Sequence, residues 1–373
     1  MFVRACAVAT VALLIAAPAR AGAPPVSATA YLVEDAATGD VLAQHASGAR
    51  VPIASITKLM TVLVTLEHAD LDDVVTVRSD AAAVGESTIN LRAGERITVR
   101  DLVEAALIQS ANDAADALAD YVGGGSSVRF VAMMNAKARE LGLTRTRFTR
   151  PDGLDAPGHV STARDVTRLA RTAMRLAAVR SIVRRRSATI AGGRVLHTWN
   201  DLLGLFPGLL GVKTGHTGGA GWCEVGAVRR YGVTLYATVL GSPTRSQRNA
   251  DLAALLRWGL SRYRPAWIVR PGHVYLRAAV GYGRAAVPIV PLRAVARPVR
   301  VDRPLVERVV APAALSLPVQ RGTRVGDVRV FSGRRLVVRM PLVAGRSVSK
   351  PGLGGRVGFY VRRTFSHVGG WFS

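Results

Sequence analysis

The chain has 373 residues, of which 49% are hydrophobic, so it can build packed cores and is not a wholly disordered protein. Fifty Lys and Arg residues against 25 Asp and Glu give a formal net charge of +25, which would attract nucleic acid, an anionic membrane surface or an acidic substrate. Because only four of the basic residues are lysines, a drift of composition toward arginine explains the charge equally well. The length favours two domains.

The first 21 residues have the features of a secretory signal peptide. Arg4 forms a short positive region, residues 5–17 are apolar except for Thr10, and Ala19-Arg20-Ala21 fits the small-x-small cleavage rule. An uncleaved membrane anchor is the alternative, but this apolar stretch is shorter than the ~20 residues needed to span a bilayer. No later run predicts a transmembrane helix. An exported protein does not meet the genome, so nucleic acid is not an expected partner.

The cysteines and histidines argue against a disulfide framework and a metal site. Cys6 leaves with the signal peptide, so Cys223 remains alone. Cys223 lies in an apolar, strand-like run, which predicts a buried structural thiol rather than a nucleophile. The seven histidines occur in no HExxH or CxxC context. We therefore expect neither a metal nor another cofactor.

Residues 26–264 alternate between strand and helix patterns. Apolar spacing and turn residues predict the following elements in chain order: strands at 28–34 and 40–44 around a Thr38-Gly39 turn, a helix after Pro52, helices at 99–109, 111–122 and 126–141, a helix beginning at 161–165 with Ser161 or Thr162 as its N-cap, strands at 208–214, 221–228 and 233–240, and a helix at 252–263. Strands at both ends with helices between them predict an α+β domain, whose antiparallel sheet joins segments far apart in sequence.

Residues 265–353 differ from the preceding part in composition and in the spacing of their apolar residues. Alternating Val and Arg with frequent Gly and Pro predict short strands at about 299–301, 324–330 and 336–339, and hence a small, β-rich C-terminal domain. Residues 265–373 contain 19 basic and 3 acidic residues. Most of the net charge of the chain therefore belongs to this C-terminal part.

Residues 354–373 predict an amphipathic helix on a membrane surface. The apolar side of its helical wheel carries Val357, Tyr360, Val361, Thr364, Phe365, Val368, Trp371 and Phe372, whereas Arg356, Arg362, Arg363 and His367 fall elsewhere. A basic helix of this kind lies in a membrane interface rather than across the bilayer. The alternative is a helix packed on its own domain. Phe359, which is off the stripe, and Gly369-Gly370 argue against a regular helix.

Three short motifs could carry chemistry. A serine is a poor nucleophile until a base removes its proton. Ser55 and Lys58 are three residues apart at the start of a predicted helix, so they share a face and the amine reaches the hydroxyl. Lys58 acts as a base only if burial and a second cation lower its pKa, and Lys213 could be that cation. The motifs occur in this order: Ser55-Ile56-Thr57-Lys58, Ser110-Ala111-Asn112 and Lys213-Thr214-Gly215.

Each motif alone has an ordinary structural explanation. Ser55 could be a helix N-cap and Lys58 a surface lysine. At a helix N-terminus, however, Ser55 would also have backbone N–H groups and a positive dipole end nearby, which suit an oxyanion. The ordered set of three motifs within one domain favours the catalytic interpretation.

This set of motifs resembles the one found in class A β-lactamases and penicillin-binding proteins. From about residue 30 to residue 260, the sequence most resembles the low-molecular-mass penicillin-binding proteins that are D-alanyl-D-alanine carboxypeptidases of the peptidase S11 type. Beyond the three motifs, the matching stretches are residues 53–61, 110–114, 151–154, 161–165, 200–203, 206–208, 213–217 and 220–223.

The resemblance implies a fold and an activity. The fold is a serine β-lactamase/penicillin-binding-protein-like transpeptidase domain, with helices on the faces of an antiparallel sheet and a helical subdomain, followed by a small all-β domain. The activity is removal of the terminal D-alanine from peptidoglycan pentapeptide stems through an acyl-enzyme, with β-lactams as covalent inhibitors. No cofactor is implied, and the location is the periplasm or the outer face of the cytoplasmic membrane.

The resemblance also implies a role for each catalytic residue. Ser55 is the acylated nucleophile and Lys58 is its general base. Ser110 relays a proton toward the leaving D-alanine, and Asn112 holds both the Lys58 side chain and the substrate amide. Lys213 adds positive potential.

Substrate binding is implied for a strand and an arginine. The strand is an edge that a substrate peptide joins by β-addition. The backbone N–H groups of Ser55 and His216 would form the oxyanion hole, and hydroxyls together with a cation would receive the terminal carboxylate. For Arg248 an ordinary solvated arginine remains the alternative. The implied substrate-binding residues are Thr214, Gly215, His216, Thr217 and Arg248.

Three other functions remain open. A class A β-lactamase needs a glutamate base between the second and third motifs, where only Glu140 occurs, in a helical context. A D-Ala-meso-diaminopimelate endopeptidase opens a related bond. A non-catalytic protein that binds an envelope polymer through its charge would not need the three motifs. Lys-Thr-Gly-His-Thr and the additional β domain favour the carboxypeptidase.

Overall fold

The computed structural model describes residues 6–13 and 22–369, which divide into two compact units. The larger unit is Gly22–Ser261. The second, which we call the β unit, combines Arg262–Ser373 with an N-terminal strand, β1 (Cys6–Leu13). The sequence places the corresponding domain boundary at residue 264.

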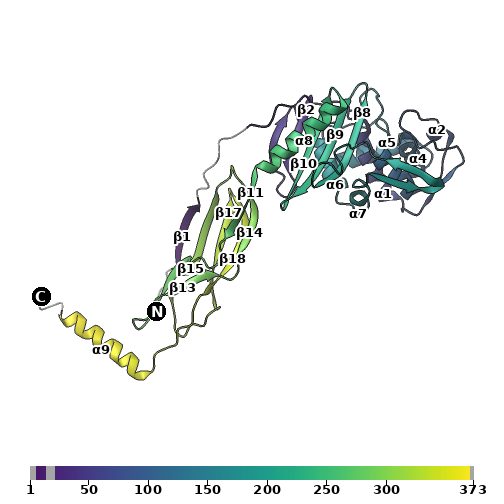
Figure 1. The fold of residues 1–373 in the computed structure, drawn as a ribbon. Coiled ribbons are helices and arrows are strands. Elements are labelled where there is room, and N and C mark those ends of the chain that lie inside the picture. The colour runs from purple at the N-terminus through teal and green to yellow at the C-terminus, as the bar shows by residue number, and fades with distance from the viewer. Residues whose placement is uncertain (1–5, 14–21, 370–373) are drawn as a thin grey trace. The chain divides into compact units, whose positions relative to one another are not determined.

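The larger unit is built on one antiparallel sheet of five strands (Figure 1). In spatial order these are β3 (Val41–His45), β2 (Ala30–Asp35), β10 (Val233–Ser242), β9 (Gly221–Arg230) and β8 (Leu209–Thr217). β2 pairs with β10 in the register Leu32↔Thr238. The first strands of the unit thus join its last ones, which confirms the predicted sheet.

Helices cover both faces of this sheet. On one face lies α8 (Arg245–Ser261), which approaches so closely that a Cβ on Gly226 of β9 would lie 2.9 Å from the Leu252 side chain. On the other face lies α6 (Ala163–Ala173), whose Thr167 hydroxyl is 2.7 Å from that of Thr238. Alternate residues of each strand therefore face α8 and α6, as the pleat requires.

A helical region completes the larger unit. α1 is its central helix: it contacts α4, α5 and α6, and most of its residues are buried. The remaining elements are η1 (Ala54–Thr57), α1 (Lys58–His68), α2 (Ser79–Ala82), α3 (Val99–Glu104), η2 (Ala105–Gln109), α4 (Asn112–Val122), α5 (Ser127–Glu140), α7 (Ala177–Ile182), η3 (Ala191–Gly193) and the strand pairs β4 (Val74–Thr76) with β5 (Arg96–Thr98) and β6 (Ser187–Ile190) with β7 (Arg194–His197).

Three predicted helices differ in detail from those observed. The helix after Pro52 begins with the 3₁₀ turn η1, and the helix predicted at 99–109 changes at Ala105 into the π-helical turn η2. α8 begins at Arg245, well before the predicted residue 252. Its first turns are polar and show no apolar period, but Thr244 caps the helix by accepting a hydrogen bond from the Gln247 N–H.

The predicted start of α6 is confirmed. The Thr162 hydroxyl accepts a hydrogen bond of 3.1 Å from the Asp165 N–H, so Thr162, one of the two predicted candidates, is the N-cap. The Asp165 side chain lies in the first turn of the helix, where a negative charge is favourable.

The β unit is dominated by strands, as predicted. Its main sheet has the order β1-β15-β17-β18-β13-β12-β16. The strands are β15 (Leu305–Pro312), β17 (Arg324–Ser332), β18 (Arg335–Ala344), β13 (Val287–Pro291), β12 (Leu276–Val280) and β16 (Ala314–Leu315), with a separate pair formed by β11 (Tyr263–Val269) and β14 (Val295–Arg300). Buried Ile289, Val328 and Leu342 belong to its core.

β1 belongs to the segment predicted as a signal peptide. It pairs antiparallel with β15, from Cys6↔Pro312 to Leu13↔Leu305. The rest of the segment, including the proposed cleavage site at Ala19-Arg20-Ala21, lies outside the described residues. Export and cleavage remain predictions.

The last element among the described residues is α9 (Leu353–Gly369). Leu353, Val357, Tyr360 and Val361 are all exposed. Phe359 contacts the Tyr282 ring of the β unit, with ring centroids 5.8 Å apart. Trp371 and Phe372 of the predicted apolar stripe lie outside the described residues. Within residues 6–13 and 22–369, no helix combines the length and the apolar character needed to span a membrane.

Candidate active site

The three sequence motifs meet at one cleft of about 210 Å³. η1 and the first residue of α1 provide the first motif, the junction of η2 and α4 the second, and β8 the third. We call this space the active-site cleft. Its lining is Ser55, Glu86, Ser87, Ser110, Asn112, Leu154, Trp199, Thr214, Gly215, His216, Trp222 and Arg248.

Ser55 and Lys58 are in direct contact. The Lys58 Nζ lies 2.9 Å from the Ser55 Oγ, and Lys58 is 0% exposed. Ala54, the residue before the serine, has φ +48°, a conformation that costs a non-glycine residue energy and that often occurs at functional sites. The backbone therefore turns sharply where it presents Ser55 to the cleft.

Three acceptors surround the Lys58 amine. Nζ donates to the Ser55 Oγ, to the Asn112 Oδ1 at 2.6 Å and to the Asp152 carbonyl oxygen at 2.6 Å. Burial lowers the pKa of Lys58 to about 8, opposed by nearby carboxylates, of which Asp152 has the largest effect. An amine with this pKa exists in both forms near neutral pH, as a general base must.

The second motif places a serine beside a second lysine. Ser110 ends η2 in the left-handed conformation, with φ +66°. The Lys213 Nζ donates to the Ser110 Oγ at 2.8 Å and to the Thr214 carbonyl oxygen at 2.9 Å. Burial, and then the Lys58 and Arg248 cations, hold the pKa of Lys213 well below its usual value.

The expected cause of the Lys58 shift needs a correction. The sequence predicts that burial and a second cation, Lys213, together lower the pKa of Lys58. Burial is confirmed as the main cause of the lowered Lys58 pKa, but Lys213 is not among the main groups that shift it. The Lys58 cation instead adds to the effect of burial in lowering the pKa of Lys213. The Lys213 amine thus lies by the cleft mainly as a partner of Ser110.

β8 lies against the serine. A Cβ on Gly215 would lie 3.0 Å from the Ser55 nitrogen and 3.0 Å from the Ile53 carbonyl oxygen, so only glycine fits without movement. β8 is the last strand of the five-stranded sheet, so one edge of it is unpaired within that sheet. The edge is available to an extended peptide beside Ser55.

Arg248 lies in α8 and lines the cleft. It is 1% exposed, so the alternative of a solvated surface arginine is wrong. Its Nη2 donates to the Asp201 Oδ2 at 3.1 Å and to the Asn249 Oδ1 at 2.6 Å, and its Nε lies 3.0 Å from the Glu224 Oε2. The Trp222 ring centroid is 5.6 Å from its Cζ.

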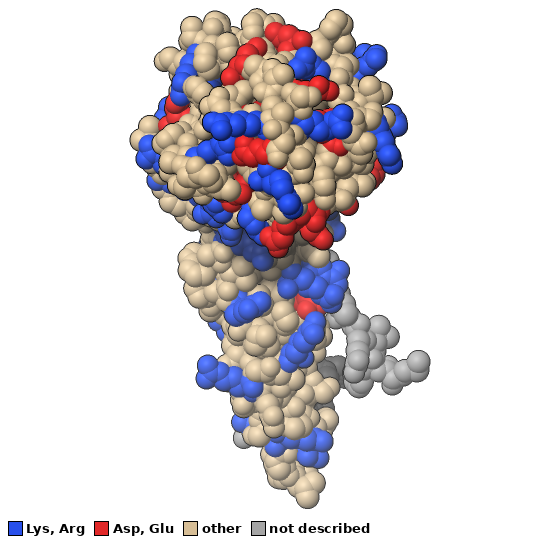
Figure 2. Space-filling view, turned by 90° about the vertical axis from the view of Figure 1, so that its right-hand side faces the viewer, with Lys and Arg blue, Asp and Glu red and all other residues tan. Residues whose placement is uncertain are grey.

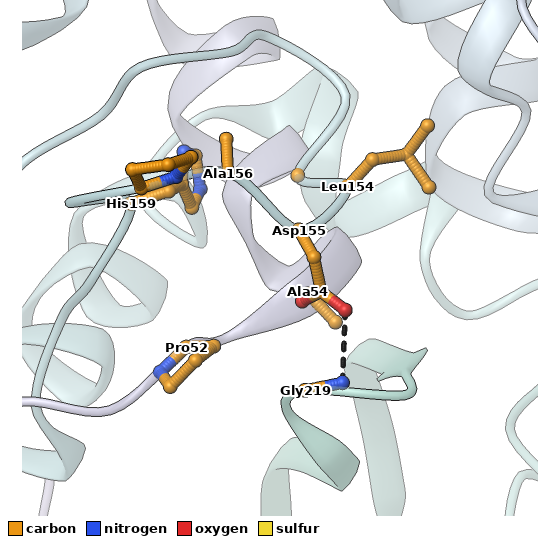
Figure 3. A pocket seen from close by; sticks show the side chains of 9 residues that line it. Pro52, Ala54, Leu154, Asp155, Ala156, His159 and Gly219 are labelled. Carbon is orange, nitrogen blue, oxygen red and sulfur yellow. Dashed lines mark hydrogen bonds between the residues drawn. The ribbon is translucent and has the colours of Figure 1, made fainter.

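Thr217 is not part of the cleft lining. Its hydroxyl donates to the Asp155 Oδ1 at 2.7 Å. Figure 3 shows the second bond of this carboxylate, in which the Gly219 N–H donates to the Asp155 Oδ2 at 2.8 Å. Thr217 therefore closes the turn between β8 and β9. Asp155 and Gly219 also line a second cavity of about 350 Å³, together with Pro52, Ala54, Gly153, Leu154, Ala156, Pro157 and His159.

Sequence reasoning missed the roles of Arg150 and Asp152. Arg150 forms two hydrogen bonds to the Asp152 carboxylate, of 2.9 and 2.6 Å, and the same carboxylate accepts a bond from the Leu154 N–H. This network holds the carbonyl that binds Lys58. Gly153 follows with φ +88°, and a Cβ there would lie 2.3 Å from the Ala54 carbonyl oxygen. The signal in the sequence is the Pro-Asp-Gly turn.

Cys223 is the buried structural thiol that the sequence predicts. It is fully buried on β9, and burial raises the pKa of the thiol to about 12. A thiolate is therefore not available near neutral pH.

The geometry supports acyl transfer by a serine. A nucleophilic hydroxyl, a buried amine with a pKa near 8 and a second serine-lysine pair converge at the free edge of a sheet. These are the parts of a nucleophile-and-base mechanism acting on an extended peptide.

Comparisons with known proteins agree with this geometry. The family model for D-alanyl-D-alanine carboxypeptidase, peptidase S11, matches residues 17–244. The chain is 32% identical to D-alanyl-D-alanine carboxypeptidase DacC of Escherichia coli (strain K12), across 94% of this chain and 92% of that protein.

Solved structures are similar as well. Penicillin binding protein 5 from Haemophilus influenzae is 25% identical with a TM-score of 0.64, across 88% of this chain and 99% of that chain. The Streptomyces K15 DD-transpeptidase is 32% identical with a TM-score of 0.60, across 64% of this chain and 98% of that chain.

Proposed function

The chain belongs to the peptidase S11 family of D-alanyl-D-alanine carboxypeptidases, and from this premise we propose which residues carry out the reaction. The enzyme is a serine-type carboxypeptidase of the penicillin-binding class, and its substrate is the peptidoglycan stem peptide. The observation that carries the assignment of roles is the contact of the buried Lys58 amine with the Ser55 hydroxyl at 2.9 Å.

In the acylation step, neutral Lys58 removes the proton of Ser55. The Oγ attacks the carbonyl carbon of the penultimate D-alanine and forms a tetrahedral intermediate. The backbone N–H groups of Ser55 and His216 stabilise its oxyanion. Gly215 allows the close approach of β8 that this arrangement requires.

Ser110 and Lys213 serve the leaving group. As the intermediate collapses, the amide bond breaks, and the terminal D-alanine receives a proton through Ser110 at its nitrogen. The 2.8 Å contact with Lys213 supports this relay because it links the hydroxyl to a second amine. Water then hydrolyses the acyl-enzyme. A β-lactam acylates Ser55 in the same way.

Asn112 and β8 position the substrate. The Asn112 Oδ1 holds Lys58, and its Nδ2 donates one hydrogen to the Gly85 carbonyl oxygen at 2.9 Å, which leaves the second hydrogen for a substrate carbonyl. The stem peptide pairs with the edge of β8 at Thr214, and Arg248 receives its terminal carboxylate. Thr217 contributes indirectly, because it fixes the turn that follows the strand.

The location is also part of the proposal. The enzyme works on the outer side of the cytoplasmic membrane after removal of residues 1–21, and α9 binds the membrane surface. The exposure of Leu353, Val357, Tyr360 and Val361 supports this, as does the basic composition of the β unit. Figure 2 displays one face, on which acidic residues mix with basic ones over the larger unit but are sparse over the β unit.

The other functions are not favoured by the comparisons. Glu140 is the one glutamate between the second and third motifs that could serve as the base of a β-lactamase. It is the last residue of α5 and pairs with Lys137. To test the carboxypeptidase against an endopeptidase, the full chain is incubated with a defined pentapeptide and with a cross-linked dimer. We expect D-alanine from the pentapeptide in the wild type and none in Ser55→Ala. Monomers from the dimer without D-alanine from the pentapeptide would contradict the carboxypeptidase.

A further inference from the structure

Glu224 is a fully buried acid beside the active-site cleft. It lies on β9 and is 0% exposed. Its neighbours on the same face of the strand are Trp222, which lines the cleft, and Gly226, which packs against α8. A carboxylate in such a place is costly unless a cation and hydrogen-bond donors compensate for the lost water.

The compensation for Glu224 is incomplete. The Arg248 Nε is 3.0 Å from the Glu224 Oε2, yet neither carboxylate oxygen accepts a hydrogen bond of acceptable geometry from the described residues. The buried carboxylate is therefore stabilised by charge alone. Burial raises the pKa of Glu224 to about 7, and the Arg248 cation opposes this shift.

The other charged groups around Glu224 do not supply the hydrogen bonds that its carboxylate lacks. From the segment before β8, Asp201 shares the Arg248 guanidinium and also binds Arg245. On β8, Lys213 favours the ionised acid, whereas His216 is stacked on Trp222, with ring centroids 4.0 Å apart. On α8, Asp251 is held by Ser27 and Ser242, and β10 presents the apolar Val239 opposite Glu224.

Two carboxylates thus compete for one guanidinium before any substrate arrives. In the proposed function, the terminal carboxylate of the stem peptide is a third anion on Arg248. Like charges repel strongly in a site removed from water. The group that can most readily give up its charge is the one without hydrogen bonds, Glu224.

We propose that Glu224 sets the charge that Arg248 presents to the cleft, and that it takes up a proton when a peptide carboxylate binds there. This inference rests on the proposed function, in which Arg248 receives the carboxylate. The proton comes from solvent and is released when the product leaves. Glu224 is then a specificity-determining residue, although it does not touch the reacting atoms.

The proposal predicts a pH-dependent preference for a free C-terminus. Below the Glu224 pKa, the acid is neutral and Arg248 attracts the carboxylate fully. Above it, binding must include a proton, so affinity for the carboxylate falls as pH rises. A peptide whose C-terminus is an amide carries no charge there, so its binding requires no proton uptake by Glu224.

The test compares an acyl-D-Ala-D-Ala peptide with its C-terminal amide on the full chain, from about pH 6 to about pH 8.5. The measured quantity is kcat/KM for the acid divided by kcat/KM for the amide. Titration of Lys58 affects both substrates equally and therefore cancels in this ratio. In the wild type this ratio falls by up to about tenfold per pH unit, the limit for one coupled proton. In Glu224→Gln it stays at its low-pH value.

Glu34→Gln is the matched control. Glu34 is a half-buried acid of the same sheet, paired with Arg171 and remote from the cleft. Its variant keeps the pH dependence of the wild type. An unchanging ratio in the wild type, or an equally steep fall in Glu224→Gln, overturns the inference.

A binding measurement tests the inference independently of catalysis, in case Glu224→Gln loses activity through misfolding. In Ser55→Ala, calorimetric titration with the peptide acid in two buffers of different protonation enthalpy should show uptake of up to about one proton. The double variant with Glu224→Gln should show none, and equal uptake would overturn the inference. Failure of the proposed function would look different, because the wild type would then release no D-alanine at any pH.

Discussion

At the scale of residues, the protonation of Lys58 decides when the nucleophile is active. The pKa of Lys58 is about 8, so acylation by a penicillin accelerates as the pH rises toward that value and the amine loses its proton. Four nearby acids, Asp152, Asp116, Asp113 and Glu86, oppose the effect of burial, and Asp152 has the largest effect.

Removing the Asp152 charge therefore has a predictable sign. Asp152→Asn withdraws a negative charge that favours protonated Lys58, so the pKa of Lys58 falls and the midpoint of the pH–acylation profile moves to lower pH. We expect a displacement of about half to one pH unit, the size of one partly screened charge interaction. Stopped-flow acylation across pH measures it.

A second carboxylate on the same loop provides the control. Asp155 binds the turn between β8 and β9 and is not among the main groups that shift the Lys58 pKa. Asp155→Asn should leave the midpoint in place, even if the rate changes. A midpoint that moves upward in Asp152→Asn would contradict the electrostatic account.

Most of the reacting groups could be predicted from the sequence at this scale, because the three motifs are local. What the sequence does not show is burial by distant segments. Asp201 and Glu224 both contact Arg248 only in the folded chain, and Asp152 reaches Lys58 through a loop far along the chain. Glu224 does leave one sign, a lone acid in an apolar strand run.

At the scale of elements, the loop around Gly153 fixes the distance between η1 and the acceptor of Lys58. We predict that Gly153→Ala destabilises the fold by about 2–4 kcal/mol and slows penicillin acylation at least about tenfold, because its Cβ would collide with backbone. Urea unfolding and acylation kinetics measure the two effects.

Gly158 offers a matched substitution in the same loop. It also has positive φ, at +75°, but its Cβ would meet only the Arg147 side chain, at 3.9 Å. Gly158→Ala should cost only the strain of about 1 kcal/mol and leave acylation nearly unchanged. Equal losses in both variants would show that strain, rather than contact with η1, is responsible.

Helix and strand order follows from apolar periodicity, and the fold class was predictable for that reason. The errors occur where local polar chemistry replaces periodicity. Thr244 begins α8 ahead of its apolar residues, and Ser110 ends a π-helical turn that a simple α-helical period does not reveal.

At the scale of the whole molecule, α9 tests the membrane proposal. A chain ending after Gly355, and separately the pair Val357→Glu with Val361→Glu, should lose sedimentation with anionic lipid vesicles while keeping D-alanine release. The reason is that exposed apolar side chains provide the interfacial binding energy. Phe359→Ala, which removes the contact with Tyr282 instead, is the control and should still sediment.

Sedimentation of the truncated chain equal to that of the full chain would contradict the membrane role of α9. It would favour the packed-helix interpretation.

The high net charge has no part in catalysis on this account, because the reaction depends on two of the four lysines, Lys58 and Lys213.

The central claim, that Ser55 is the acylated nucleophile, has a direct measurement. Trypsin releases residues 51–58, which contain Ser55 and one other hydroxyl, Thr57, whereas Ser110 lies in the separate peptide 101–129. After brief exposure to penicillin, mass spectrometry should find the adduct in peptide 51–58, with fragment ions that place it on Ser55. An adduct on Ser110, or labelling that persists in Ser55→Ala, would contradict the account.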